Sequence, residues 1–224
     1  DKELNYLQRI MSRPKTPLTI ILGGAKIDTK LELINQFLEK ADNIIIGGGM
    51  AFTFLRAKGK NIGGSLLDKS MITIAKSIIN NAISKGTKLI LPIDAVCASS
   101  LKDRNDKKTY PIDEIPSKMM GLDIGPDSVI RFNEFLGNSE TILWNGPMGV
   151  FESKAYENGT REMAIHLVSC VASGAKVIVG GGDTAAALEK FGLMKDMTHV
   201  STGGGASLEL LSGNALPALN ALEK

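Results

Sequence analysis

The sequence lacks the features that would tie it to a membrane, an oxidising compartment or a polyanion. Its 224 residues include two cysteines, Cys97 and Cys170, far apart and without CxxC spacing, so we expect no disulfides and a reduced, cytoplasmic setting. No apolar run approaches the roughly 18 residues that span a bilayer, and the charged start of the chain does not resemble a signal peptide. A net charge of +2 gives no reason to expect nucleic acid or an anionic membrane as partner.

Residues for nucleophilic and metal catalysis are also scarce. The two histidines are His166, within an apolar helical stretch, and His199, at the start of a predicted strand, and both positions favour structural roles. The sequence holds no convincing Ser–His or Cys–His pair, no His/Cys cluster with metal-ligand spacing and no GxxxxGK[ST] phosphate loop. Any chemistry is therefore expected to act by positioning and electrostatics.

What the sequence does contain is a repeated unit, an apolar β-type run that ends in a small-residue turn before helix-forming sequence. The five turns are Gly23-Gly24-Ala25-Lys26, Gly47-Gly48-Gly49, Asn145-Gly146-Pro147, Gly180-Gly181-Gly182-Asp183 and Gly203-Gly204-Gly205. A buried strand, a glycine turn and a helix together place free backbone N–H groups at a helix N-terminus, which suits phosphates. One such turn carries little weight, but five predict a nucleotide-binding edge of an α/β sheet.

The alternation of strand and helix patterns predicts one domain with a three-layer, Rossmann-like fold, in which a mostly parallel sheet has helices on both faces. Strands are predicted at residues 18–22, 43–46, 88–91, 140–144, 176–179 and 198–201. Helices are predicted at 2–12, around 31–38, and at 50–58, 68–85, 126–136, 153–173, 184–191 and 205–211. Residues 97–128 are expected to form an irregular excursion that carries a short antiparallel strand or hairpin.

Two lysines follow the first glycine turn. Lys26 and Lys30 have i,i+4 spacing, which on a helix places both ammonium groups on one face. One interpretation is that they bind the oxygens of a transferred phosphoryl group. The other is that they are ordinary surface lysines, and the spacing alone favours this second interpretation. Two cations near a helix N-terminus oppose the macrodipole by a few tenths of a kcal/mol each, which hints at a ligand anion.

The turn Gly180–Thr184 also has two interpretations. Asp183 before a helix is by default an N-cap. Alternatively, the turn amides and the Thr184 hydroxyl bind phosphate while Asp183 binds Mg²⁺, which takes one or two carboxylates together with phosphate oxygens. The stretch also fits G-x-G-x-x-A, a dinucleotide fingerprint, but no acidic residue ends the next strand at Val200-Ser201.

Six motifs, in order, closely resemble the second half of the phosphoglycerate kinase family. They are Gly23-Gly24-Ala25-Lys26, Gly47-Gly48-Gly49-Met50-Ala51-Phe52, Leu91-Pro92-Ile93-Asp94, Trp144-Asn145-Gly146-Pro147-Met148-Gly149-Val150-Phe151-Glu152, Gly180-Gly181-Gly182-Asp183-Thr184 and Ser201-Thr202-Gly203-Gly204-Gly205-Ala206-Ser207. The resemblance covers essentially the whole chain. It implies an interdomain linker helix at 1–14 and a nucleotide-binding domain at 15–224, with the N-terminal, substrate-binding lobe absent.

The resemblance also implies a role for each matching residue. On the phosphate side the catalytic residues are Lys26, at the transferred phosphoryl group, and Gly181 and Gly182, in the triphosphate and Mg²⁺ turn. Lys30, Asn145 and Thr184 contact the phosphates, and Asp183 binds Mg²⁺. On the nucleoside side the matching residues are Gly48, Gly49, Leu67, Gly121 and Leu122 in an adenine slot, and Glu152 at the ribose hydroxyls.

The activity implied by the resemblance is reversible, Mg²⁺-dependent phosphoryl transfer between ATP and the carboxylate of 3-phosphoglycerate, a step of glycolysis. A carboxylate nucleophile has no proton to lose at neutral pH, which agrees with the lack of a histidine base. The family binds 3-phosphoglycerate through an Arg and His cluster of the N-terminal lobe, which nothing here resembles. We therefore expect a monomeric fragment that binds ADP or ATP without turnover.

Two alternatives stay open at this point. A nicotinamide-dependent dehydrogenase domain has the partial fingerprint in its favour, and preference for ADP over NADH would exclude it. A non-catalytic nucleotide-binding module would use the same site, and only turnover with the missing lobe would exclude that.

Overall fold

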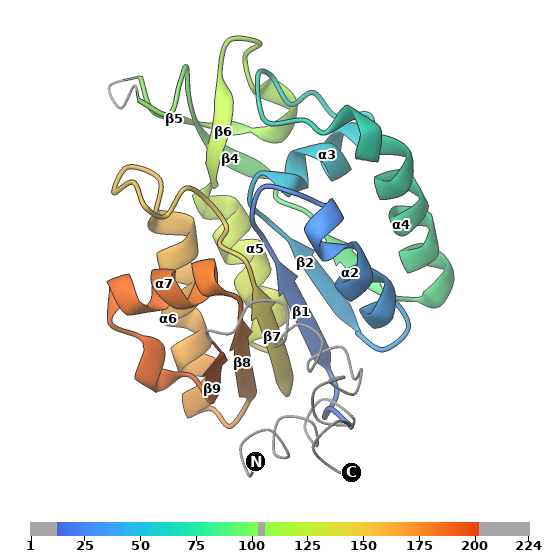
Figure 1. Ribbon diagram of the computed structural model, residues 1–224, viewed down its shortest axis with the longest axis vertical. Coiled ribbons are helices and arrows are strands. Elements are labelled where there is room, and N and C mark those ends of the chain that lie inside the picture. Colours follow the sequence, from blue (N-terminus) through green and yellow to red (C-terminus); the bar gives the residue numbers. More distant parts are fainter. Residues whose placement is uncertain (1–12, 103–105, 202–224) are drawn as a thin grey trace, which may run out of the picture.

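The computed structural model describes residues 13–102 and 106–201, and a parallel sheet forms its centre (Figure 1). The strands of this sheet are β1 (Leu18–Leu22), β2 (Asn43–Ile46), β3 (Lys88–Ile90), β7 (Thr141–Asn145), β8 (Lys176–Gly180) and β9 (His199–Ser201). Their spatial order is β3-β2-β1-β7-β8-β9, and every neighbouring pair is parallel. The prediction of a Rossmann-like α/β fold is confirmed.

Helices cover both faces of the sheet. They are α2 (Leu31–Phe37), α3 (Met50–Ala57), α4 (Ile72–Lys85), α5 (Pro126–Leu136), α6 (Asn158–Ala172) and α7 (Gly182–Phe191). Short 3-10 turns lie at Asp28–Lys30, Lys69–Met71, Ile112–Glu114 and Met194–Asp196.

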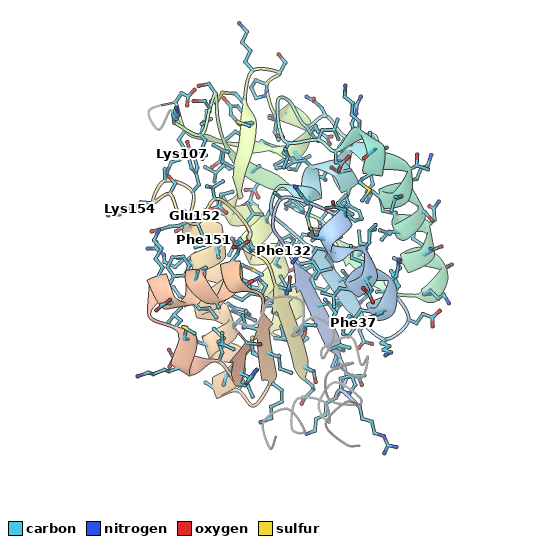
Figure 2. All side chains as sticks on the ribbon, in the orientation of Figure 1. Phe37, Lys107, Phe132, Phe151, Glu152 and Lys154 are labelled. Carbon is cyan, nitrogen blue, oxygen red and sulfur yellow. The ribbon has the colours of Figure 1, made fainter. Side chains whose placement is uncertain are left out.

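The central strands are buried on both faces, and their alternating side chains divide the core into two layers. Ile20 of β1 packs in the layer formed with α2, α3 and α4, whereas Ile21 packs in the layer formed with α5, α6 and α7. Phe37 and Phe132, labelled in Figure 2, belong to these two opposite layers. Burial on both faces explains why these strands read as continuous apolar runs.

A second, antiparallel sheet lies beyond the carboxyl ends of the parallel strands (Figure 1). Its strands, in the order β5-β4-β6, are β4 (Asp94–Ala98), β5 (Lys108–Pro111) and β6 (Met120–Ile124). The region predicted as an irregular excursion with a strand or hairpin is thus more regular than expected.

Two predictions about helices are wrong. Lys26 and Lys30 do not share a helix, because the N–H of Lys30 bonds the carbonyl of Ile27, three residues back, in a 3-10 turn, and α2 begins only at Leu31. The helix predicted from residue 153 begins at Asn158, since residues 151–157 form turns that bury Phe151 and Tyr156.

Some predictions lie outside the described residues. They are the helices at 2–12 and 205–211 and the turn at Gly203–Gly205. The division into a linker at 1–14 and a domain from residue 15 stays a prediction.

Candidate functional site

The strand order reverses between β1 and β7, and the loops that follow these strands meet there. The N–H of Gly23 donates to the carbonyl of Asn145 at 2.9 Å, and that of Gly24 donates to Pro147 at 2.9 Å. The loop after β2 joins them through Gly48 N–H, 3.1 Å from the carbonyl of Met148. Ligands of open α/β sheets bind in the crevice at such a reversal.

Close approach of these loops depends on glycine at position 48. Gly48 has φ +64°, a left-handed conformation that L side chains rarely adopt, and a Cβ there would lie 2.5 Å from the nitrogen of Gly24. Backbone packing alone therefore requires a glycine at this position, whether or not a ligand binds there.

Beside this junction lies a cleft of about 380 Å³. Its lining includes six of the residues singled out in the sequence, which are Gly48, Gly49, Gly121, Leu122, Glu152 and Asp183. Further lining residues are Ala25, Phe52, Leu66, Asp123, Met148 and Val150. The lining comes from the antiparallel sheet, from the glycine loops after β1 and β2, and from the segment that follows β7.

Lys30 lies at the phosphate end of the predicted site and is held by Asn145. Its ammonium donates to Asn145 Oδ1, while Asn145 Nδ2 donates to the carbonyl of Gly180 at 2.9 Å. Burial lowers the pKa of Lys30, and the negative charge of Asp183 opposes that shift. The structure thus brings Lys30, Asn145 and Asp183 together at the start of α7.

The N-terminus of α7 is formed by Gly181, which has φ +95° and no side-chain capping bond within the described part of the chain. Asp183 therefore does not act as the N-cap; it is exposed and lines the cleft. The first N–H groups of a helix have no intrahelical acceptor, so this turn can receive an anion. Thr184 is fully buried, and its hydroxyl accepts the N–H of Gly146 at 2.7 Å.

Seven of the predicted residues are not part of the cleft lining. Lys30, Asn145, Gly181, Gly182 and Thr184 gather around the start of α7, next to the lining residue Asp183. Lys26 and Leu67 lie elsewhere. Lys26 is exposed on the turn that follows Ala25, and its carbonyl accepts the hydroxyl of Thr29 at 3.1 Å. Leu67 packs against the core on the α2–α4 side, whereas its neighbour Leu66 lines the cleft and is 49% exposed.

Asp123 was not singled out by sequence reasoning, although it lies in the cleft wall and is 4% exposed. Its carboxylate accepts the N–H groups of Gly159 at 2.7 Å and of Ile124 at 2.9 Å. Burial nevertheless raises the pKa of Asp123 to about 8, which favours the protonated form. A single Asp in a stretch predicted to be an irregular excursion carries no sequence signal for such an environment.

No group of three or more His, Cys, Asp or Glu side chains within the described ranges, 13–102 and 106–201, could hold a metal ion. None of the helices described is long and apolar enough to cross a membrane.

The fold and this cleft define the class of protein: an open α/β domain whose candidate ligand site lies where the strand order reverses, and reaches from an apolar slot toward a helix N-terminus. The particular family follows from comparison, since the family model described as phosphoglycerate kinase matches residues 1–214. The chain belongs to the phosphoglycerate kinase family.

Individual relatives agree with this membership. The chain is 47% identical over 224 residues to phosphoglycerate kinase of Gloeothece citriformis, covering all of this chain and 56% of that protein. The structure of phosphoglycerate kinase from Coxiella burnetii matches with a TM-score of 0.93 at 40% identity, over 99% of this chain and 56% of that one. The enzyme from Pyrococcus horikoshii matches with a TM-score of 0.82 at 28% identity, over 99% and 55%. The chain thus spans about half the length of its relatives.

Proposed function

We propose that this chain is the C-terminal, nucleotide-binding half of a phosphoglycerate kinase and binds ADP or ATP with Mg²⁺ in the cleft beside β1 and β7. The observation that carries the proposal is an apolar cleft whose lining reaches Asp183 in the first turn of α7, where the helix N-terminus has no side-chain cap and the Lys30–Asn145 pair lies close by. These features correspond to the flat base and the charged phosphates of a nucleotide. Family membership supports the same ligand.

The adenine base would occupy the slot between the glycine loops and the antiparallel sheet. Leu66 and Leu122 provide apolar surface there, and Gly49 and Gly121 keep the slot open. Glu152 lies in the lining contributed by the segment after β7, where its carboxylate could accept hydrogen bonds from ribose hydroxyls. Leu67, expected from the resemblance to contact adenine, would act through Leu66 and the core behind it.

The phosphates would lie against the first turn of α7. The N–H groups of Gly182 and its neighbours, together with the ammonium groups of Lys30 and Lys26, would neutralise phosphate charge. The donor set fits Mg²⁺, because Asp183 supplies an exposed carboxylate that is not used as a helix cap. When bound, Mg²⁺ would stabilise negative charge on the phosphate oxygens, and Asp183 would hold it.

The proposed reaction is reversible transfer of a phosphoryl group between ATP and the carboxylate of 3-phosphoglycerate. Residues of this chain would hold the nucleotide in line and neutralise charge, without a proton-transfer step. The acceptor would be bound by a second lobe of the same protein, which is consistent with relatives nearly twice as long. We further propose that the whole protein is a monomer and acts in the cytoplasm.

A calorimetric titration with ADP, with and without Mg²⁺, tests the proposal. We expect one saturable site in the wild-type chain, and we expect Asp183→Asn to remove the Mg²⁺ dependence of ADP affinity. The matched control is Asp196→Asn, because Asp196 is exposed on the turn after α7 and loses the same charge. A folded chain that binds no ADP would contradict the proposal, as would equal effects of the two variants.

A further inference from the structure

The segment between β7 and α6, residues 149–157, forms one wall of the cleft but has little regular structure of its own. It contributes Gly149, Val150 and Glu152 to the lining, and its internal hydrogen bonds are turn contacts such as Ser153 N–H to the carbonyl of Val150 at 3.0 Å. A wall of this kind depends on contacts with its neighbours to keep one position.

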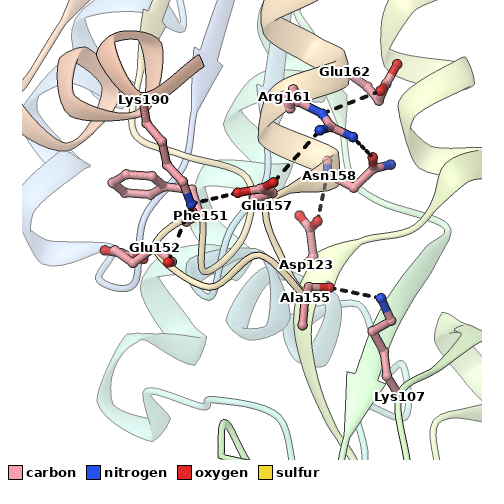
Figure 3. A network of polar contacts seen from close by, with 11 residues as sticks. Lys107, Asp123, Phe151, Glu152, Ala155, Glu157, Asn158, Arg161, Glu162 and Lys190 are labelled. Atoms are coloured by element: carbon pink, nitrogen blue, oxygen red, sulfur yellow. Dashed lines mark hydrogen bonds and ion pairs between the residues drawn. The ribbon is translucent and has the colours of Figure 1, made fainter. Parts of the chain in front are cut away.

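Lys190, in the last turn of α7, contacts this segment at three residues (Figure 3). Its ammonium donates to the carbonyl of Phe151 at 2.7 Å and reaches that of Glu152 at 3.4 Å. The same ammonium forms an ion pair with Glu157 Oε2 at 2.6 Å. One side chain thus contacts both ends of the wall, on either side of the turns between them.

Glu157 makes this arrangement specific because it is largely removed from water. The residue is 8% exposed, and its second carboxylate oxygen lies 3.8 Å from Arg161 Nη1. A buried carboxylate without a cation is strongly unfavourable, so the pairing of Glu157 with Lys190 favours the observed position of the wall. Lys107 supports the opposite edge by donating to the carbonyl of Ala155 at 3.2 Å.

We propose that Lys190 is a positioning residue, which holds the 149–157 wall against α7 through Phe151, Glu152 and Glu157 and so fixes the nucleoside side of the cleft. α7 then serves both parts of the site, since its first turn carries Asp183 and its last turn holds the wall that carries Glu152. The importance of this link for ligand affinity rests on the function proposed above.

Hydrogen–deuterium exchange of the nucleotide-free chain tests the link directly. The N–H groups of Phe151, Ser153 and Tyr156 bond within the segment, so their exchange reports its opening. In Lys190→Met we expect this exchange to accelerate about tenfold, because a hydrogen bond to a charged group is lost. Lys190→Arg should retain slow exchange, since it keeps the charge and the donors.

The matched control is Lys195→Met, which removes the same charge from an exposed position on the turn after α7. We expect wild-type exchange of the 149–157 segment in this control. Unchanged exchange in Lys190→Met, or equal acceleration in the control, would overturn the proposal.

ADP affinity then tests the consequence for the site. Lys190→Met should weaken ADP binding about three- to tenfold, more than Lys195→Met does, and Lys190→Arg should restore it. If exchange accelerates in Lys190→Met while its ADP affinity matches that of Lys195→Met, then Lys190 holds the wall in place but does not position the nucleotide site. If the wild-type chain itself binds no ADP, the proposed function fails. The exchange experiment then still tests whether Lys190 holds the 149–157 wall in place.

Discussion

The protonation of Asp123 predicts an unusual dependence of stability on pH. Burial raises the pKa of this carboxyl from 3.8 to about 8 in the folded protein, whereas the unfolded chain has the ordinary value. Between these two pH values the folded state holds a proton that the unfolded state has released. The contribution of Asp123 to the free energy of unfolding is therefore complete below pH 3.8 and falls as the pH rises toward 8.

The magnitude follows from the linkage relation. One proton bound only by the folded state lowers the free energy of unfolding by a little over 1 kcal/mol per pH unit. Over the whole interval the loss is on the order of 5 kcal/mol. That is a large part of the stability of an ordinary domain.

The assay is urea denaturation of the wild type and of Asp123→Asn at several pH values. These values should cover roughly pH 4.5 to 8, where the folded and unfolded states bind different numbers of protons. The Asn side chain cannot accept from both Gly159 and Ile124, which lowers stability by a constant amount at every pH. The difference in slope between the two curves isolates the titration of Asp123, because the other groups cancel. We expect the slope for Asp123→Asn to be less negative by about 1 kcal/mol per pH unit, and parallel curves would refute the reasoning.

Two further predictions concern packing around the cleft. Thr184→Val should lower the free energy of unfolding by about 1–3 kcal/mol, because it leaves the buried N–H of Gly146 without its acceptor. Thr184→Ser keeps the hydroxyl and should retain most of that stability. Equal losses for Thr184→Val and Thr184→Ser in urea denaturation would contradict this explanation. Gly121→Ala should cost about 1–3 kcal/mol in thermal unfolding, since its Cβ would overlap the ring of Phe52. Gly137→Ala, where the nearest heavy atom to a new Cβ lies at 3.4 Å, is the control expected to stay near the wild type.

The parallel sheet was predictable because its strands are local signals. Ile20 and Ile44 lie in unbroken apolar runs that end in glycine turns, and burial on both faces requires that pattern. The antiparallel sheet was harder to predict, because β5 has exposed Lys108 and Thr109 and its residues do not alternate clearly. Its pairing with β4 depends on contacts between distant parts of the chain.

The same distinction applies to the site. The turns around Gly48 and Gly182 are visible as short motifs. In the structure the Gly48 loop bonds the loop after β7, and the turn before α7 bonds Asn145 at the end of β7 through Gly180. The Lys190–Glu157 pair joins residues 33 positions apart (190 minus 157), and no local pattern marks either partner. The burial of Asp123 likewise arises from the approach of Gly159 in another element.

The geometry around the start of α7 also bears on the dehydrogenase alternative. The partial fingerprint at Gly180 and Gly182 requires an acidic residue at the end of the next strand to bind ribose, but that strand, β9, ends at Ser201. Instead, Asn145 fills the space beside the turn and holds the ammonium of Lys30 there. A cation at this position favours the terminal phosphates of a nucleoside di- or triphosphate, whose charge exceeds that of an internal pyrophosphate. The turn therefore fits the proposed nucleoside di- or triphosphate better than it fits a dinucleotide.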